Sequence, residues 1–579
     1  MLAHDNAFGR RNLGTVVSEV LVLVVSALVF SMAFPGLVLS GGFGALAFVS
    51  LIPLFAVIRR TTWALTPFYG FLFGFVFYLM FNYWLKTFHP LAILIVPIIK
   101  GGEMVFLFLA LKAADRWFRS FGYLTQAFAW LAYTYVSQSW FAGYPYGMIG
   151  YALYQYRILI QIADITGIWG INFLMILPQT FLGAWVGDRW RGTFFTGGRG
   201  IFGSGEEYFR PGKPKMTSAS LSAYLKDQRL AVIIYAALVL GTLVYGAVSL
   251  STWNAMEPDR LWRVAAVQHN SDSWKGGYDQ YKKNFNIMRR MSLEALRYEP
   301  DMIIWSETAF VPSVSWHTQY PSDQRTAALV DEFLAFGKSL PVPLLTGNPE
   351  GVLANPDLPP LLENGEWNRA DYNGVLLFED GEVKDTYRKQ HLVPFTEHFP
   401  YEKQMPWLYN LLLANDYNWW EKGTESTVFE TADGVRFSTP ICFEDVFGYL
   451  TAAFVRTGAD VIVNMTNDSW SQAVSAEVQH VAMAVFRSVE TRRSTIRGTN
   501  SGITTVITPT GRMVNPMPPF VEDWRMYEVP VYTADTYGNT PYTRYGDTPM
   551  RLISMAVVIF MALAAAWQAG EKIVERRKK

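Results

Sequence analysis

The segment Val435-Arg436-Phe437-Ser438-Thr439-Pro440-Ile441-Cys442-Phe443-Glu444-Asp445 joins an apolar, strand-like run to two acidic residues. It contains Cys442, the single cysteine among 579 residues, so an intrachain disulfide is excluded. A lone cysteine is more often a small buried hydrophobe than a nucleophile. The rest of the chain must therefore decide between a packing role and a chemical role for Cys442.

The composition indicates a membrane protein. Hydrophobic residues make up 51% of the chain and charged residues 17%, which is too apolar for an ordinary soluble protein of this length. The formal net charge is zero, which gives no support to nucleic-acid binding because such binding calls for a basic face.

Long apolar runs predict membrane spans, each of which needs about 20 residues. We predict about eight transmembrane helices, seven in the first part of the chain and one near its end. They lie near residues 15–34, 38–58, 64–85, 91–111, 124–141, 160–187, 230–251 and 552–569. The first run follows Arg10 and Arg11, but it is long and lacks a small-residue cleavage site. We therefore interpret it as a retained helix rather than a signal peptide.

Basic residues between the spans predict the orientation, because cytoplasmic connections are rich in Arg and Lys. The connections that share one side with the N-terminus carry nearly all of these residues. They are Arg59-Arg60, the region 112–119, the connector 188–229 and the tail 575–579. We expect a multi-pass membrane protein with both termini cytoplasmic and the long polar segment on the other side, which in a bacterium is the periplasmic side of the inner membrane. That compartment is oxidising, but a single cysteine has no partner in the chain with which to form a disulfide.

Two acidic residues, Glu103 and Asp164, lie within or at the edge of apolar runs, where an unpaired charge is costly and often functional. Glu103 is close to Lys100 in the sequence, and Asp164 is near a predicted interface. Structural and functional roles both stay open for these acids. The aromatic segment 140–146 is typical of the outer membrane interface.

The segment from about 258 to 535 has a different pattern, in which short strand-like runs alternate with helical stretches. The strand-like runs are 263–268, 302–305, 344–347, 375–378, 383–387, 461–464 and 503–508, and the helical stretches are 277–296 and 474–493. About 280 residues are enough for one layered α/β domain with its own core. We therefore predict a transmembrane domain over 1–251, an α/β domain over 258–535 and a final transmembrane helix over 552–569.

Three segments of the α/β domain end a strand-like run with a chemically capable residue, namely Glu307, Lys389 and Cys442. Strand ends are where α/β folds build their sites. A thiolate attacks an acyl carbonyl, a carboxylate takes the thiol proton, and an ammonium faces the developing oxyanion, with the Phe443 N–H as a second donor. Each residue alone is a weak signal, but the set predicts acyl chemistry at Cys442.

These residues resemble the nitrilase superfamily, whose triad runs Glu, Lys, Cys in this chain order. A nitrilase-like domain between seven spans and one final span is similar to the apolipoprotein N-acyltransferase family. The most specific stretches are Tyr387–Phe395, Asn467-Asp468-Ser469-Trp470 and Arg497–Ile503. The resemblance covers essentially the whole chain and implies an αββα sandwich for the α/β domain.

The resemblance also implies a role for five residues. Glu307 would be the general base, Lys389 the oxyanion stabiliser and Cys442 the nucleophile, with Glu397 and Glu444 as supporting acids. N-capping or a solvated loop is the alternative for the last two. The chain departs from the family at Ser306, Thr396, Phe443 and Ser471-Gln472, where Pro, Gly, Tyr and Phe-Gly are common. No triad position is lost, and Trp274 is too far out of register to be matched to a family tryptophan.

The implied reaction is a two-step acyl transfer that needs no metal or organic cofactor. Cys442 would take the sn-1 acyl chain of a phospholipid, with phosphatidylethanolamine as the expected donor. The thioester would then pass the chain to the α-amino group of the diacylglyceryl-cysteine at the N-terminus of an apolipoprotein. Two alternatives are another membrane-bound nitrilase-like amidase or acyltransferase, and a membrane scaffold with an inactive domain.

Two further interpretations concern the α/β domain. His391, His398 and His480 are not spaced like a metal site, so we interpret them as structural or loop residues. The apolar segment Met405–Leu413 is too short to span a bilayer. It is either a lid or arm at the membrane surface, or a core helix.

Overall fold

The computed structural model describes residues 13–87, 92–118, 121–140, 143–189, 221–321, 323–399, 401–413 and 419–577. Most of the basic residues that predict the orientation lie outside these ranges. They include Arg10, Arg11 and those of the greater part of the connector 188–229. Two compact units make up the chain. The first unit comprises Met1–Trp140, Tyr144–Val248 and Asp547–Lys579, and the second comprises Phe141–Gly143 and Ser249–Gly546.

The first unit is helical. Its main helices are α1 (Leu13–Met32), α2 (Ile52–Arg60), α3 (Thr66–Phe81), α4 (Ala92–Trp117), α5 (Gly122–Ser139), α8 (Ile168–Arg189), α10 (Arg229–Ala255) and α19 (Thr548–Arg577). Among the described residues, α1, α4, α8, α10 and Thr548–Glu571 of α19 are long and apolar enough to cross a membrane. Length and composition thus support five of the eight predicted spans within the described residues.

Local breaks explain why some predicted spans are shorter than expected. The run 38–58 becomes a 3₁₀ turn, η2 (Gly44–Phe48), and the nine-residue α2, which has a proline in its first turn. The run 160–187 is interrupted at Gly167, whose φ of +61° is left-handed, and α8 starts only at the next residue. Glycine adopts this conformation at low cost and ends a helix there.

The two acidic residues of the apolar runs are both paired within the first unit. Glu103 Oε2 lies 2.5 Å from Lys100 Nζ and accepts a hydrogen bond from Ser137 Oγ at 2.8 Å. The Asp164 carboxylate accepts from the Tyr245 hydroxyl at 2.8 and 2.9 Å, which joins α7 (Ala163–Thr166) to α10. These contacts favour the structural interpretation of both acids, because a buried carboxylate is tolerated where it is paired or hydrogen-bonded.

The second unit contains two six-stranded sheets. In spatial order the first sheet is β12-β1-β2-β3-β4-β5 and the second is β11-β10-β9-β8-β7-β6. The strands of the first sheet are β1 (Arg260–Gln268), β2 (Met302–Ile304), β3 (Leu344–Leu353), β4 (Arg369–Glu379), β5 (Glu382–Arg388) and β12 (Asp523–Val531). Those of the second are β6 (Phe429–Glu430), β7 (Arg436–Ser438), β8 (Val461–Thr466), β9 (Ser494–Thr499), β10 (Thr505–Ile507) and β11 (Met513–Val514).

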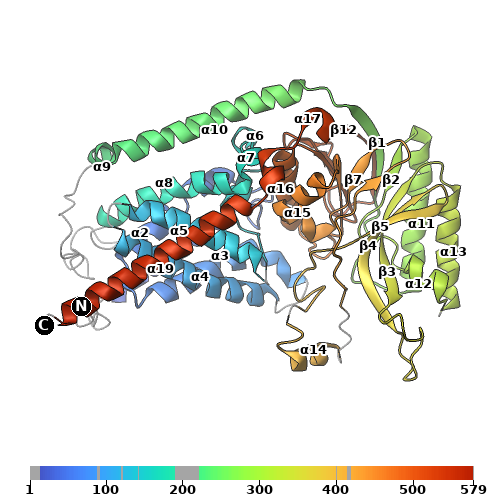
Figure 1. Ribbon diagram of the computed structural model, residues 1–579, viewed down its shortest axis with the longest axis horizontal. Coiled ribbons are helices and arrows are strands. Elements are labelled where there is room, and N and C mark those ends of the chain that lie inside the picture. Colours follow the sequence, from blue (N-terminus) through green and yellow to red (C-terminus); the bar gives the residue numbers. More distant parts are fainter. Residues whose placement is uncertain are drawn as a thin grey trace. The chain divides into compact units, whose positions relative to one another are not determined.

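The sheets pack face to face between two layers of helices (Figure 1). Contacts across the sandwich include the Trp262 and Phe437 rings, 5.5 Å apart, and hydrogen bonds from Thr499 and Thr504 to Gln268. The helices α11 (Tyr278–Ala295), α12 (Val314–Gln319) and α13 (Gln324–Ser339) cover the first sheet, and α15 (Gly448–Arg456) and α16 (Val474–Thr491) cover the second. The predicted αββα sandwich is confirmed.

Parallel strands form the middle of each sheet. β1, β2 and β3 are parallel in the first sheet, and β7, β8 and β9 are parallel in the second. All six residues of β8 are buried, as expected for a β-branched run covered on both faces. The loops that follow the carboxyl ends of β2 and β8 meet, since the Asn467 N–H after β8 donates to Glu307 after β2.

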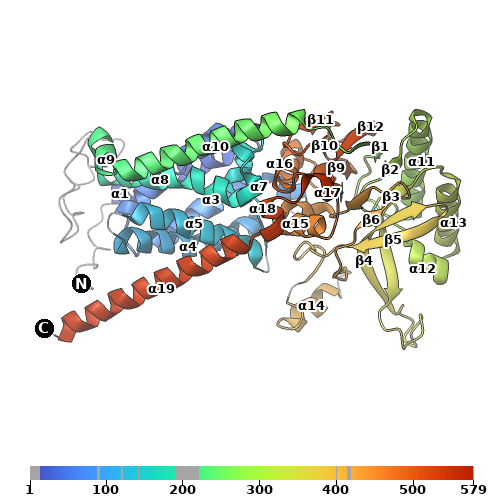
Figure 2. The ribbon, with the colours of Figure 1, turned by 45° about the horizontal axis from the view of Figure 1, so that its top comes forward.

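The helix α14 (Pro406–Leu413) stands apart from both sheets in each view of the ribbon (Figures 1 and 2). None of its residues is buried, and the Trp407 side chain is 67% exposed. The alternative of a core helix is therefore wrong, and the segment is an apolar arm. Its base is fixed by the rings of Phe399, Tyr409 and Trp419, whose centroids lie 6.0 to 6.5 Å apart.

The aromatic core beneath α11 and α13 gives a test of the fold. Phe333 is fully buried, and its ring lies 4.4 Å from that of Phe310. Phe333→Ala should cost about 3–5 kcal/mol through the cavity that it leaves. We expect the melting temperature of the detergent-solubilised protein to fall on the order of 10 °C. Leu293→Ala on α11, where the leucine is 49% exposed, is the control and should melt like the unmodified protein.

Candidate active site

The sequence-predicted site residues of the second unit all follow strands of the sandwich. Glu307 lies just beyond β2, Lys389 is the residue after β5, and Cys442 follows β7 and begins the 3₁₀ turn η7 (Cys442–Val446). Glu307 and Lys389 are buried, with 5% and 1% of their surfaces exposed, whereas Cys442 is partly exposed. A buried charged pair next to a cysteine is an arrangement suited to nucleophilic chemistry.

The Lys389 ammonium is shared by two carboxylates. Lys389 Nζ lies 2.8 Å from Glu397 Oε1 and 3.3 Å from Glu307 Oε1. The Asn373 amide on β4 donates to the same two oxygens, at 2.8 Å to Glu307 and 3.2 Å to Glu397. Glu397 Oε2 accepts from the Val393 N–H at 2.8 Å. The predicted supporting acid Glu397 is therefore part of one buried network with Glu307 and Lys389.

The backbone holds Glu307 from its other side. Its Oε2 accepts from the Asn467 N–H, directly after β8, at 2.9 Å. Gly347 on β3 passes so close to the Glu307 turn that a Cβ there would lie 2.3 Å from the Thr308 nitrogen. Only a glycine fits at this crossing. Both oxygens of Glu307 are thus fixed before any substrate binds.

Cys442 has a left-handed backbone conformation, with φ +48°. Such a conformation is unusual for a residue with a side chain and is maintained at functional sites by the surrounding structure. It turns the chain sharply from the end of β7 into η7, as the nucleophile does on a strand–turn–helix elbow. The Cys442 turn therefore has the geometry of a presented side chain rather than that of a packed core cysteine.

The charges at the site shift one another's pKa values. Burial raises the pKa of Glu307, which the Lys389 ammonium opposes and the Glu397 carboxylate reinforces. Burial and then the negative charge of Glu307 raise the pKa of the Cys442 thiol, while Lys389 lowers it. Burial alone would lower the pKa of Lys389, but Glu307 and Glu397 outweigh it and raise that pKa. Lys389 is therefore a permanent cation, and Glu307 is a stronger proton acceptor than an exposed glutamate.

Glu444 has a different position from Glu397. It is fully buried and accepts three backbone hydrogen bonds, from Ile441, Gln390 and His391, at 2.6 to 2.9 Å. The Tyr387 hydroxyl donates to it as well, at 2.8 Å. Burial raises the pKa of Glu444 to about 7, while the Ile441 N–H and the Lys389 charge lower it. Glu444 thereby fastens the loop after Lys389 to the turn that carries Cys442, which a solvated loop residue would not do.

Sequence reasoning did not identify three neighbours of the site. The Asn373 amide binds both Glu307 and Glu397, the Asn467 N–H binds Glu307, and the Tyr387 hydroxyl binds Glu444. The only signal for Asn373 was a polar residue two positions before an apolar run, and backbone donors leave no mark in the sequence. The roles of Glu307, Lys389, Cys442, Glu397 and Glu444 remain predictions that this geometry supports.

The predicted structural histidines have clear surroundings. The His391 ring packs on Phe447, with centroids 3.9 Å apart, and His480 lies between Asp445 and Asp468. In the described part of the chain, no group of three or more His, Cys, Asp or Glu side chains is arranged to hold a metal ion.

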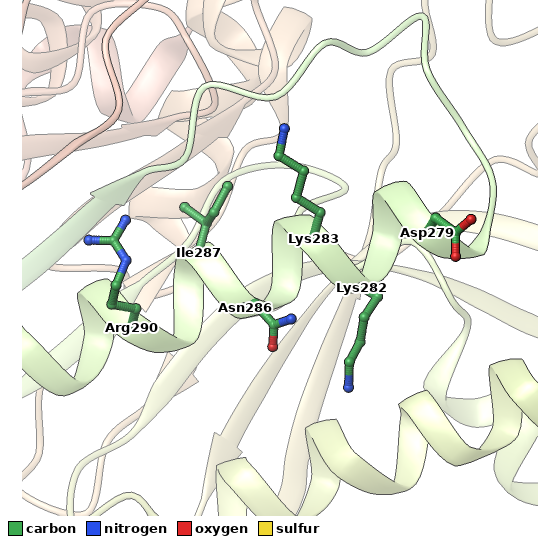
Figure 3. A pocket seen from close by; sticks show the side chains of 6 residues that line it. All are labelled: Asp279, Lys282, Lys283, Asn286, Ile287 and Arg290. Atoms are coloured by element: carbon green, nitrogen blue, oxygen red, sulfur yellow. The ribbon is translucent and has the colours of Figure 1, made fainter.

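A depression on α11 lies away from these residues (Figure 3). Its lining side chains are Asp279, Lys282, Lys283, Asn286, Ile287 and Arg290, and they point away from one another. Lys282 pairs with Glu332, and Arg290 pairs with Glu522 at 2.5 Å. This is a solvated helix face rather than a site with converging groups.

Comparisons with known proteins agree with both units. Residues 26–180 match the model of the apolipoprotein N-acyltransferase N-terminal domain, and residues 263–537 match that of the carbon-nitrogen hydrolases. Apolipoprotein N-acyltransferase 1 of Treponema denticola is 36% identical over 91% of this chain and 93% of its own. The enzyme of the same name from Treponema pallidum is 34% identical over 91% and 92%.

The similarity to solved structures is weaker than the similarity to these two relatives. An amidase of Nesterenkonia sp. AN1 is 16% identical, with a TM-score of 0.32 over 48% of this chain and 93% of that one. The fold of the second unit is therefore assigned from its own strand order and from the family model.

The Glu444 contacts give a test of the site geometry. Glu444→Gln keeps the shape but puts an amide NH₂ opposite backbone donors, and a buried donor left without an acceptor costs about 1–3 kcal/mol. We expect alkylation of Cys442 by iodoacetamide to slow at least about 10-fold, because that cost displaces the turn. Glu430→Gln on β6, which is exposed, should leave the rate unchanged. An unchanged rate in Glu444→Gln would show that Glu444 does not hold the nucleophile turn.

Proposed function

The chain belongs to the apolipoprotein N-acyltransferase family, and we propose that it moves an acyl chain from a phospholipid to the N-terminal amine of a lipoprotein. The proposed chemistry is supported by the position of the Cys442 thiol on a left-handed turn, where the Glu307 charge raises its pKa and the Lys389 charge lowers it. A nucleophile, a base and a fixed cation at one site are the components that acyl transfer requires.

In the first step, Glu307 takes the thiol proton and Cys442 Sγ attacks the sn-1 ester carbonyl of the phospholipid. Lys389 and the Phe443 N–H stabilise the negative charge that develops on the carbonyl oxygen. The C–O bond to glycerol then breaks, and the alkoxide leaves as lysophospholipid with the proton that Glu307 holds. The raised pKa of Glu307 favours its acceptance of the thiol proton.

In the second step, the α-amino group of a diacylglyceryl-cysteine attacks the thioester carbonyl. Glu307 takes a proton from the amine, the C–S bond breaks, and Cys442 receives the proton back as the amide forms. The Glu397 carboxylate keeps Lys389 in place through both steps, which its 2.8 Å ion pair supports. Each step consumes and returns one proton, so the cycle closes without a further reactant.

The membrane context is part of the proposal. Both substrates carry acyl chains, so the site must be reached from a lipid surface rather than from bulk water. The apolar arm α14 belongs to the same excursion of the chain as Glu397, between β5 and β6, and its exposed Trp407 and Leu411 suit contact with lipid. We propose the periplasmic face of the inner membrane, with phosphatidylethanolamine as the expected donor.

The alternatives differ in the second acceptor. A membrane-bound amidase with the same residues would pass the acyl group to water, and another acyltransferase would use another amine or alcohol. An inactive scaffold is disfavoured because Glu307, Lys389 and Glu397 are held in one hydrogen-bonded network.

Labelling tests the reaction directly. The purified protein is incubated with phosphatidylethanolamine that carries a heavy-isotope sn-1 chain, and the Cys442 peptide is then analysed by mass spectrometry. We expect a mass increase of one acyl chain, which transfers to a synthetic diacylated lipopeptide when this is added. Glu307→Gln should slow acylation of Cys442 by about 10²–10⁴-fold because it removes the proton acceptor.

Two controls define the outcome of the labelling experiment. Cys442→Ala should show no thioester, and Glu430→Gln should be labelled like the unmodified protein. The absence of acylated Cys442 would rule out the enzyme proposal. A thioester that releases its chain only to water would exclude the transferase and favour the amidase.

The orientation has a separate test. A thiol reagent that cannot cross membranes, added to intact spheroplasts, should modify Cys442 from the periplasmic side. Because Cys442 is the only cysteine in the chain, the labelled site is unambiguous. Modification only after the membrane is opened, when detergent-solubilised protein reacts readily, would place the second unit in the cytoplasm.

A further inference from the structure

A buried charge network lies directly behind the nucleophile turn. His480 on α16 contacts two carboxylates: its Nδ1 lies 2.8 Å from Asp468 Oδ1 and its Nε2 lies 2.8 Å from Asp445 Oδ1. All three side chains are almost inaccessible, with exposures of 5%, 11% and 1%. The histidine therefore bridges two acids in a region that water does not reach.

The geometry fixes the charge of His480. A neutral imidazole has one N–H and one lone pair, so it can satisfy only one of two carboxylates. Both contacts are hydrogen bonds only if both ring nitrogens donate, which means that His480 is an imidazolium. The other carboxylate would otherwise face a lone pair in a buried environment, at a high electrostatic cost.

The remaining groups of the network balance its charge. Arg497 on β9 pairs with Asp445 and lies 3.3 Å from Asp468 Oδ2. Burial and the Asp468 carboxylate raise the pKa of Glu477 on α16 well above its usual value, which favours its neutral form. Two cations, His480 and Arg497, thus oppose two anions, Asp445 and Asp468. Loss of the histidine charge would leave this buried cluster with a net negative charge.

The two carboxylates belong to two different parts of the active site. Asp445 lies in η7, three residues after Cys442, and Asp468 directly follows Asn467, whose N–H holds Glu307. A hydrogen-bonded bridge between them joins the turn of the nucleophile to the loop that fixes the base. The left-handed backbone conformation of Cys442 needs such support, because a strained conformation persists only where several surrounding contacts hold it in place.

We propose that His480 is a positioning residue, whose two carboxylate contacts lock the Cys442 turn to the Glu307 loop and offset negative charge beside the thiolate. The proposal rests on the proposed function in so far as Cys442 is the nucleophile. His480 touches no reacting group. It acts through Asp445 and Asp468, and in this it goes beyond the structural interpretation that the sequence supported.

The electrostatics agree with this geometry. Burial lowers the pKa of His480, but Asp445 and Asp468 outweigh it and raise the pKa to about 9, with Arg497 opposing. The Asp468 charge itself raises the pKa of the Cys442 thiol. Removal of the imidazolium would therefore leave Asp468 with Arg497 as its remaining cationic partner in the network and make the thiol harder to ionise.

The experiment uses the full-length protein in detergent, three single variants and the double variant His480→Gln/Asp445→Asn. His480→Gln removes the charge and one of the two donors, and Asp445→Asn weakens the bridge from its other end without changing His480. The third is the control His317→Gln on α12, which replaces a partly exposed histidine of the other helix layer with the same amide. Iodoacetamide alkylation of Cys442 between pH 6 and 10 and the kcat and KM for acyl transfer are measured for each.

For His480→Gln we expect alkylation at pH 8 to fall at least about 10-fold, with the pH midpoint of thiol ionisation shifted upward, because an opposing charge is lost. The kcat should fall at least about 10-fold with KM within about 2-fold, because the substrate contacts are untouched. In His480→Gln/Asp445→Asn the thiol midpoint should return towards that of the unmodified protein while kcat stays low. An unshifted thiol midpoint, or a change confined to KM, would overturn the proposal.

Stability against pH gives a second readout. Since the pKa of His480 is raised from 6.5 to about 9, its contribution to stability is complete below about pH 6.5 and is lost as pH rises through about 9. The melting temperatures of the unmodified protein and of His317→Gln should therefore fall more steeply between pH 6.5 and 9.5 than that of His480→Gln. Parallel curves for all three proteins would contradict a charged bridge.

These measurements separate the proposal from the proposed function. Alkylation and melting need no acyl donor, so they test the His480 bridge even if no acyl-enzyme forms. An unmodified protein that is alkylated normally but never acylated would overturn the proposed function alone. If His480→Gln does not fold, Asp445→Asn decides: an alkylation rate equal to that of the unmodified protein would overturn the bridge, and a slower rate would support it.

Discussion

The site depends on one buried cation held between two carboxylates. Lys389 has almost no solvent contact, and it retains its charge only because Glu307 and Glu397 are both within ion-pair distance. A buried ammonium without such partners would lose its proton. The contacts with Lys389 and Asn373 orient Glu307, while burial and the Glu397 charge raise its pKa and the Lys389 charge opposes that rise. Removal of the Glu397 carboxylate would therefore alter the electrostatics of both Glu307 and Lys389.

The sequence indicated which residues to place at the site better than it indicated the contacts that hold them. Glu307, Lys389 and Cys442 were recognisable because each follows a strand-like run, and strand ends in an α/β sandwich meet at a common edge. Glu444 was named from the sequence as a supporting acid, but its contacts and those of Asn373 and the Asn467 N–H were not recognisable, since they join residues distant in the chain. The count of eight spans is not confirmed, because hydropathy measures apolar length while two of the apolar runs contain breaks, a 3₁₀ turn before α2 and Gly167 before α8.

The helix α16 shows another limit of sequence patterns. Its charged residues Glu477, His480, Arg487 and Glu490 are typical of a helix with a solvated face, yet each of them is buried. Pairs such as Arg487 with Glu490, 2.8 Å apart, explain how the helix tolerates these charges inside the unit. Because the pairing extends from α16 to Asp445 and Asp468, the polar residues of a covering helix become part of the support of the nucleophile turn.

The single cysteine has an analytical consequence. Every sulfhydryl in a preparation of this protein belongs to Cys442, so a thiol titration counts the molecules with a free Cys442 without any substrate. The fraction of molecules in which Cys442 is oxidised, acylated or blocked can be read as missing thiol per mole of chain. Specific activities of different preparations and variants can thus be placed on one absolute scale.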